Sequence, residues 1–346
     1  MTKGQKDGKL PALLKWVGYL TAIFSLCATV AGFAKYLYAR KEIAKTTNAL
    51  LATETEEAKA GDYGAGWQTL EKAKQLEPNS ARVRMAQNEL AMAWLEDVHL
   101  QESQKFSDVT DKLEPVLLRA VAAAKPGPEQ ADLRAHVGWA YFLETRDGRG
   151  NLDPAKAYQE AVAEDGNNPY AQAMWGHWIL WQHCDQISEA KQHFTAAVAA
   201  AREGKYVRRL ELNALLNCHN READLEVIRV ANDMRKEGYR PDDRERGHIL
   251  DIYPQEFMPR TAETLVFVNA VPPAEHVATF RWLFDDLPAD ENARATRIYY
   301  LAELQEAAGQ REDALSNYKM AVGQMSRFST FKEAAAAGVK RVSSIH

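Results

Sequence analysis

A spacing pattern that recurs along this chain constrains its fold more than any other feature. A small residue is followed four positions later by a large residue and three positions after that by Ala. The two clearest copies are Ala190, Phe194, Ala197 and Ala314, Tyr318, Ala321. Copies with substitutions are Gly66, Leu70, Ala73; Leu113, Leu117, Ala120; Pro154, Tyr158, Ala161; and Ala223, Val227, Val230. Steps of three and four place side chains on one helix face, so each copy predicts an amphipathic helix that buries this face.

The intervals between copies give the size of the repeating unit. The last members of the first five copies are 47, 41, 36 and 33 residues apart. A period of 34 residues or slightly more, built from two amphipathic helices, is typical of the tetratricopeptide repeat, and this chain resembles that family. The resemblance implies an all-α fold, an α-solenoid of helical hairpins whose first helices line a concave protein-binding face. Gly138 and Gly176 stand where the family's first helix has a glycine that lets its partner helix approach, and Tyr141 is expected to fill the first of these hairpins.

Helix breakers and composition divide the chain into five segments. They are a basic N-terminal tail at 1–15, a transmembrane helix at 16–38, tetratricopeptide-like repeats at 40–238, degenerate helical repeats at 239–290, and a C-terminal repeat with a capping helix at 291–346. Gly61 is expected to end a helix with a positive φ. Five prolines interrupt the region between 239 and 287, where residues 264–271 fit either a helix or a short strand.

An uncharged stretch near the N-terminus predicts a membrane anchor. The 19 residues from Trp16 to Ala34 carry no charge, and a helix of that length covers about 28 Å, nearly the thickness of a bilayer's hydrocarbon core. Trp16 and Tyr19 at one end and Tyr36 at the other are typical of an interfacial aromatic belt. Lys and Arg are balanced on the two sides, so the sequence does not fix the orientation. A signal peptide cleaved near residue 31, giving a secreted soluble protein, is the alternative.

Small residues form a stripe along the predicted anchor. They are Gly18, Ala22, Ser25, Thr29 and Gly32. Steps of three and four place them on one helix face, where small side chains allow two membrane helices to pack closely. The stripe is therefore a candidate surface for a homo-oligomer, although small residues are also common in membrane spans.

Charge and cysteine content limit the classes of function. Residues 1–46 carry eight Lys and Arg against two acids, a charge of +6, so with the whole chain at −5 the remaining 300 residues sum to −11. An acidic body argues against nucleic-acid binding. The three cysteines, Cys27, Cys184 and Cys218, are too few and too scattered to indicate a disulfide framework, and we expect them to be buried thiols.

A group of histidines and cysteines is a candidate zinc site. It comprises His177, His183, Cys184, His193, Cys218 and His219. Zinc sites in sequences show tight paired spacings, and this cluster has none, so we predict no metal. The chain also lacks the usual nucleophile and phosphate-loop motifs, so we predict no catalytic residue, no cofactor and no enzymatic activity.

The family resemblance places a protein-binding groove on the first helices of the third and fourth repeats. Counting from the two glycines, the residues expected to face inward are Trp139, Phe142, Leu143, His177, Leu180 and Trp181, joined by Tyr170. Such an apolar, aromatic surface suits an amphipathic helix or an extended peptide with bulky anchors. Packing of these aromatics between repeats is the alternative. The polar set that holds a chaperone's terminal carboxylate in this family is missing here.

These observations together predict a membrane-anchored scaffold or adaptor, a single-pass protein of the cell membrane that binds a protein partner in its groove. The repeats' side of the membrane is undetermined. A regulatory or sensing subunit of a membrane-associated enzyme or transport assembly would use the same surface, so that alternative stays open.

Overall fold

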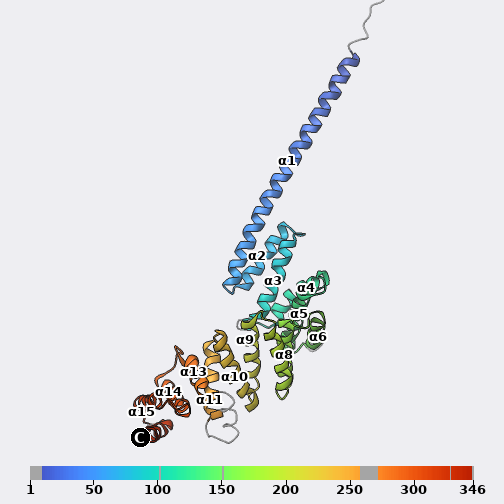
Figure 1. The fold of residues 1–346 in the computed structure, drawn as a ribbon. Helices are drawn as coiled ribbons and strands as arrows, with labels where there is room; N and C mark the ends of the chain where they lie inside the picture. Colours follow the sequence, from blue (N-terminus) through green and yellow to red (C-terminus); the bar gives the residue numbers. More distant parts are fainter. Residues whose placement is uncertain (1–9, 101–102, 150–151, 258–271, 328, 345–346) are drawn as a thin grey trace, which may run out of the picture. The chain divides into compact units, whose positions relative to one another are not determined.

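The computed structural model describes residues 10–100, 103–149, 152–257, 272–327 and 329–344, and each regular element in these ranges is an α-helix (Figure 1). The predicted all-α class is therefore confirmed for the described residues. The chain forms two compact units, Met1–Ala120 and Val121–His346. Their boundary falls inside helix α4. Residues 264–271, whose sequence fits either a helix or a short strand, lie outside the described ranges.

The first unit is built on one very long helix. Its elements are α1 (Leu10–Lys59), α2 (Tyr63–Leu76), α3 (Ala81–Glu96) and most of α4 (Ser107–Ala123). At 1.5 Å per residue the 50 residues of α1 extend about 75 Å. Helices α2 and α3 pack against its C-terminal part (Figure 1), where Thr47 and Glu54 are buried. Gly61 adopts φ +77° between α1 and α2, as predicted, because a left-handed residue there ends the helix without a Cβ clash.

The predicted membrane span lies within α1. Trp16, Gly32 and Tyr36 are exposed, whereas Gly18, Tyr19, Ala22 and Ser25 lie outside the residues whose surroundings the structure describes. Among the residues that the structure describes, no helix is both long enough and apolar enough to cross a membrane.

The second unit is a series of helical hairpins. Its helices are the end of α4, α5 (Pro128–Arg146), α6 (Pro154–Glu164), α7 (Pro169–Gln182), α8 (Ile187–Ala199), α9 (Gly204–Leu216), α10 (Arg221–Glu237), α11 (Asp243–Phe257), α13 (Pro273–Phe284), α14 (Glu291–Ala307), α15 (Arg311–Gln324) and α16 (Phe331–Ser343). Helix α5 packs on α6, α7 on α8, and α9 on α10, while α5, α7 and α9 also pack on one another in that order. Paired helices whose first members stack in sequence are the arrangement that the repeat pattern predicts.

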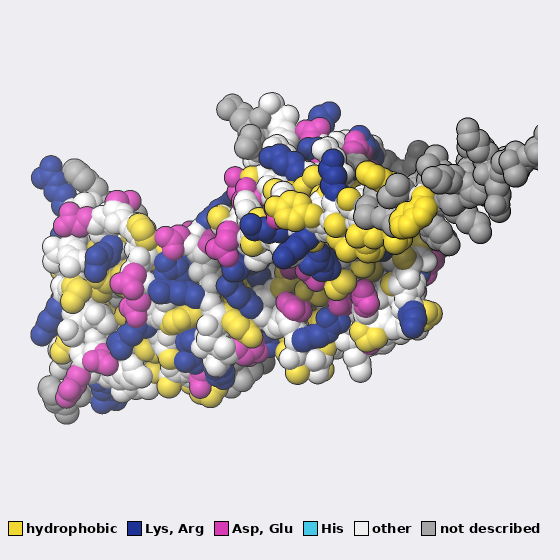
Figure 2. Space-filling view, turned by 90° about the horizontal axis from the view of Figure 1, so that it is seen from above, with side chains coloured by type: hydrophobic (Ala, Val, Ile, Leu, Met, Phe, Trp, Pro, Cys, Tyr) yellow, Lys and Arg dark blue, Asp and Glu magenta, His cyan; other side chains and the backbone are white. Residues whose placement is uncertain are grey.

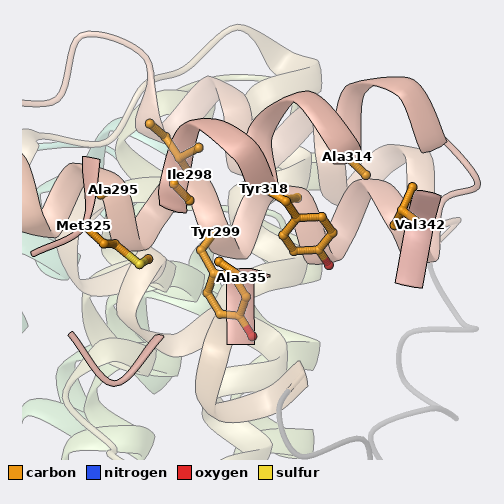
Figure 3. Close-up of a cluster of buried hydrophobic side chains, with 10 residues drawn as sticks. Ala295, Ile298, Tyr299, Ala314, Tyr318, Met325, Ala335 and Val342 are labelled. Carbon is orange, nitrogen blue, oxygen red and sulfur yellow. The ribbon is translucent and has the colours of Figure 1, made fainter. Parts of the chain in front are cut away.

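The recurring spacing pattern supplies the core of each hairpin. Its large members Tyr158, Phe194 and Tyr318 are almost fully buried, and so are the alanines that follow them. Figure 3 shows Tyr318 within the C-terminal cluster, between residues of α14, α15 and α16. The buried face predicted from sequence is therefore the face that packs.

Glycines let the large side chains come close to a neighbouring helix. A Cβ added to Gly138 would lie 2.6 Å from the Tyr158 ring, and one added to Gly176 would lie 3.0 Å from the Phe194 ring. Both distances are shorter than ordinary van der Waals contact. The ring that meets Gly138 belongs to Tyr158 on the paired helix; the filling of the hairpin by Tyr141, which is partly buried, stays a prediction.

Asparagine side chains connect successive hairpins at their turns. The Asn168 carboxamide oxygen accepts from the Ala171 amide at 2.9 Å and caps α7, while its Nδ2 donates to Asp132 at 2.6 Å. Arg202, in the turn before α9, also donates to the Asp132 carboxylate, at 2.8 and 3.0 Å. One carboxylate on α5 therefore binds groups that precede both α7 and α9.

A charged network joins α9 to α10. Arg208 pairs with Glu211 at 2.8 Å and with Glu237 at 2.7 Å, and Arg229 pairs with Glu211 at 2.6 Å. The Glu211 side chain is buried and takes a cation on each oxygen, so its burial is compensated by two charge-assisted hydrogen bonds. The face drawn in Figure 2 likewise mixes acidic and basic side chains.

The glycine contacts give a stability prediction. Gly138→Ala should lower the free energy of unfolding by about 1–3 kcal/mol, because the new methyl group forces the enclosed Tyr158 ring or its helix to move. The matched control is Gly323→Ala in α15, where nothing lies within 4 Å of the added Cβ; it should be neutral or stabilising, since Ala favours helix over Gly. Thermal melts followed by circular dichroism measure both. Equal melting temperatures for the two variants would contradict the close-approach argument.

Candidate functional site

Helices α5 and α7 bring four of the predicted groove residues together. The Phe142 ring lies 4.7 Å from Trp139, 5.1 Å from His177 and 5.4 Å from Trp181, measured between ring centroids. Trp139 and His177 are 5.1 Å apart in an edge-to-face arrangement. Such tilted and edge-to-face contacts are favourable aromatic geometries, so the four rings form one cluster with Phe142 at its centre.

Most of the predicted groove is interior, not open surface. Trp139 is 7% exposed and Phe142 1%. Leu143, His177 and Leu180 are buried as well. The side chains that follow each glycine pack between neighbouring first helices, which is the alternative that the sequence left open. Their role in binding a partner stays a prediction, and contact with them would require side chains to move.

Trp181 is the accessible part of the cluster. It lies in the last turn of α7 and is 45% exposed. One edge of its ring packs on Phe142, and the Arg146 guanidinium lies 5.4 Å from its centroid, within cation–π range. Arg146 ends α5, so the ends of two successive first helices together position one exposed indole. We call Trp181, Arg146 and the supporting Phe142 the tryptophan rim.

His177 is a neutral, buried histidine beneath the rim. Burial lowers its pKa to about 4, opposed by a hydrogen bond with Asn213 on α9, while the charge of Arg146 lowers it further. Its Nδ1 is buried and has no hydrogen-bond partner in the protein. A buried polar atom without a partner is rare in native structures. The ring therefore packs as an aromatic side chain that carries one unsatisfied nitrogen.

Tyr170 belongs to a different part of the surface. It is half-buried near the N-terminus of α7, eleven residues before Trp181 and therefore about 16 Å away along the helix axis. Its ring lies 4.6 Å from His136 and 5.4 Å from Tyr206, and Arg202 lies 5.8 Å above it. The predicted groove is thus two separate aromatic groups at opposite ends of the same helices.

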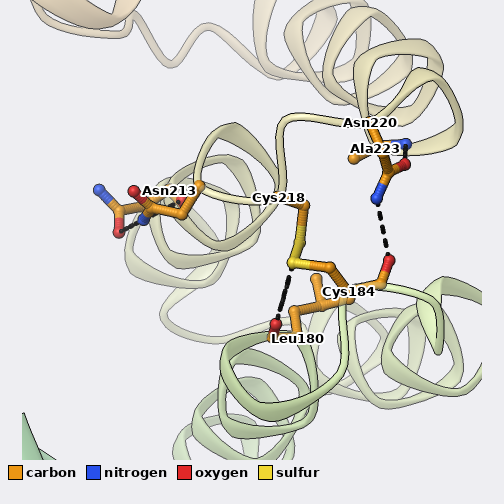
Figure 4. The surroundings of a disulfide bond; sticks show 7 residues. Leu180, Cys184, Asn213, Cys218, Asn220 and Ala223 are labelled. Carbon is orange, nitrogen blue, oxygen red and sulfur yellow. Dashed lines mark hydrogen bonds between the residues drawn. A yellow bond between two sulfur atoms is a disulfide. The ribbon is translucent and has the colours of Figure 1, made fainter.

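The prediction of buried thiols was wrong for Cys184 and Cys218, while the surroundings of Cys27 lie outside the described residues. Cys184 and Cys218 form a disulfide, with their Cα atoms 5.3 Å apart (Figure 4). Two residues that are separated by 34 positions, about one repeat, occupy equivalent places in consecutive hairpins and therefore lie side by side. The sequence contains this signal, because the spacing of the two cysteines equals the repeat period. Across the described residues, no group of three or more His, Cys, Asp or Glu is placed to hold a metal ion.

Arg146 and Asn213 were also missed. No motif in the sequence marks Arg146, which is the last residue of α5. Asn213 was missed because its role depends on the contact between α7 and α9, and no motif in the sequence marks that contact.

The chain matches no model of a known protein family and no curated protein sequence. One similar solved structure is a tetratricopeptide repeat protein from Parabacteroides merdae ATCC 43184, which is 13% identical, with a TM-score of 0.39 over 86% of this chain and 99% of that chain. Another is yeast Tom70, 11% identical, with a TM-score of 0.20 over 86% of this chain and 82% of that chain. The helical-repeat assignment of this chain rests on its own packing.

The buried His177 gives a pH prediction. Between pH 6.5 and about 4 the unfolded chain protonates this histidine while the folded chain does not, so the free energy of unfolding should fall as the pH falls through this window. His177→Phe keeps an aromatic ring there and should remove up to about 3 kcal/mol of that loss. Urea unfolding of the unaltered chain and of the variant at pH 7 and pH 4.5 measures the change in the free energy of unfolding. Burial also lowers the pKa of His276 to about 4, and this histidine is present in the unaltered chain and in the variant. The test is therefore the difference between the two pH profiles of the free energy of unfolding. Identical profiles would refute the prediction.

Proposed function

We propose that this chain is a helical-repeat scaffold that binds a protein partner through the tryptophan rim. In this proposal it is a binding protein and not an enzyme, and it needs no cofactor. The observation that carries the proposal is the exposure of Trp181. Among the described residues of the second unit, the other large apolar side chain with comparable exposure is Met320 on α15, at 44%.

The surroundings of Trp181 support its role as an anchor. Aromatic side chains, Trp above all, contribute most of the binding free energy at protein interfaces. The Trp181 ring already rests on Phe142 and Arg146, so it loses little conformational freedom when a partner covers it. An indole displayed at the end of two helices fits a bulky apolar side chain presented by a partner peptide or helix.

The test compares two variants that match in exposure. Trp181→Ala should weaken capture of the partner at least tenfold, as expected for an interface hot spot of about 2 kcal/mol, while Met320→Ala should leave capture unchanged. Affinity purification of the full chain from its own cells identifies the partner, and titration of the purified partner measures the affinity. Trp139 is left intact because truncating a buried Trp would unfold the hairpin.

A second readout locates the contact directly. A photo-crosslinking amino acid at position 181 should join the chain to that same partner, and one at position 320 should not. Equal affinity in both alanine variants, together with no crosslink from position 181, would remove the rim from the interface.

We also propose that residues 16–38 anchor the chain in the cell membrane as a single span and so tether the partner there. The support is the uncharged run from Trp16 to Ala34 and the exposure of Phe24, Leu26, Val30 and Phe33 on α1. Apolar side chains exposed in a continuous stretch are usually covered by another surface, and lipid is the occupant that a run of this length fits.

Membrane anchoring is tested by extraction. The full chain should stay with membranes at alkaline pH and be released by detergent, and a variant with Leu26→Lys and Val30→Lys should appear in the soluble fraction, because two charges at mid-span oppose insertion. Trp181→Ala is the control and should stay with membranes. Alkaline release of the unaltered chain, or an N-terminus cleaved near residue 31, would contradict the anchor.

A further inference from the structure

The disulfide joins equivalent positions of two consecutive repeats. Cys184 follows the C-terminus of α7 and Cys218 follows the C-terminus of α9, and 34 residues separate them. Their Cα separation of 5.3 Å lies within the range that disulfides require. Both cysteines are partly accessible, so an oxidant and a reductant can reach them.

The turns that carry the two cysteines are also held together by hydrogen bonds. Asn220 Nδ2 donates to the Cys184 carbonyl oxygen at 3.1 Å, and the Asn220 carboxamide oxygen accepts from the Ala223 amide at 2.9 Å (Figure 4). The residue that caps α10 therefore also holds the Cys184 turn next to Cys218. Asn168 makes a similar pair of contacts at the start of α7, where its Nδ2 donates to the Asp132 carboxylate.

We propose that the second unit, Val121–His346, resides in an oxidising compartment, where Cys184 and Cys218 are a permanent structural disulfide. Disulfides persist in exported domains and are kept reduced in the cytosol. Two cysteines fixed side by side by a hydrogen-bonded turn react with one another far more readily than with a distant thiol. Given the membrane anchor proposed above, the repeats then face the oxidising side, and the lysine-rich N-terminal tail lies on the cytosolic side.

The oxidation balances by thiol–disulfide exchange with a disulfide-bearing oxidant. One cysteine thiolate attacks the oxidant's disulfide and forms a mixed disulfide, releasing one thiol of the oxidant. The second thiolate then attacks the protein sulfur of that mixed disulfide, which forms the Cys184–Cys218 bond and releases the second thiol. The two electrons and two protons lost by the cysteines are carried away by the reduced oxidant.

The first test counts thiols in the native protein. Cells that make the full chain are quenched in acid, alkylated with a maleimide and examined by mass spectrometry of the intact protein. One alkylated thiol, that of Cys27, is expected without reduction, and three are expected after reduction. Three alkylated thiols without reduction would overturn the proposal. The test needs no mutant, so a folding defect cannot confuse it.

The second test measures what the bond does. Because it closes a loop of 34 residues, reduction should lower the melting temperature of the purified full chain by roughly 5–15 °C. The variant with Cys184→Ser and Cys218→Ser should melt at the lower temperature with or without reductant, and Cys27→Ser should behave as the unaltered chain. If the melting temperature of the unaltered chain is the same with and without reductant, the disulfide has no structural role.

The third test locates the unit. The variant Met320→Cys, in a Cys27→Ser background, places a thiol at an exposed position and should react with a membrane-impermeant maleimide from the oxidising side, before the membrane is broken. Reaction only after lysis would overturn the proposal. The thiol count tests the compartment, and alkaline extraction tests the membrane anchor. If Cys184 and Cys218 are oxidised but the protein is released at alkaline pH, the anchor is refuted and the oxidising compartment is still supported.

Discussion

The close approach of a glycine on one helix to a large ring on its neighbour sets the packing of two hairpins of the second unit, α5–α6 and α7–α8. Gly138 faces Tyr158 and Gly176 faces Phe194 at distances that leave no room for a methyl group. Each ring fills the space that the missing side chain leaves, so the two helices pack at their closest separation. The contact between the first helices α5 and α7, and the aromatic cluster that they share, follow from two hairpins that are packed in this way.

The helices and their buried faces were predictable because they follow local rules. A face defined by steps of three and four residues is buried wherever the helix packs, so Phe194 and Tyr318 could be assigned to the core from spacing alone. Which first-helix residues stay accessible could not be assigned in the same way. Trp139 and Trp181 lie on the same pair of helices, yet one is 7% and the other 45% exposed, and the difference depends on the neighbouring hairpin.

The disulfide and the tryptophan rim share one location in the hairpin stack. Cys184 follows Trp181 by three residues, across the end of α7, and Cys218 follows Asn213 by five, across the end of α9. Asn213 in turn bonds to His177 beneath the rim. The covalent bond therefore limits how far the ends of α7 and α9 can separate, and the exposed indole is presented from a fixed base.

Asp132 ties three hairpins to one carboxylate. It binds the Asn168 cap that begins α7 and the Arg202 guanidinium that precedes α9, which is 70 residues further along the chain. In most repeat arrays each unit contacts only its immediate neighbours, and the ends fray unit by unit. Here, opening the hairpin of α5 breaks a hydrogen bond of the residue that caps α7 and the ion pair made by Arg202 before α9. We therefore expect the three hairpins to unfold more nearly together than units that contact only their immediate neighbours.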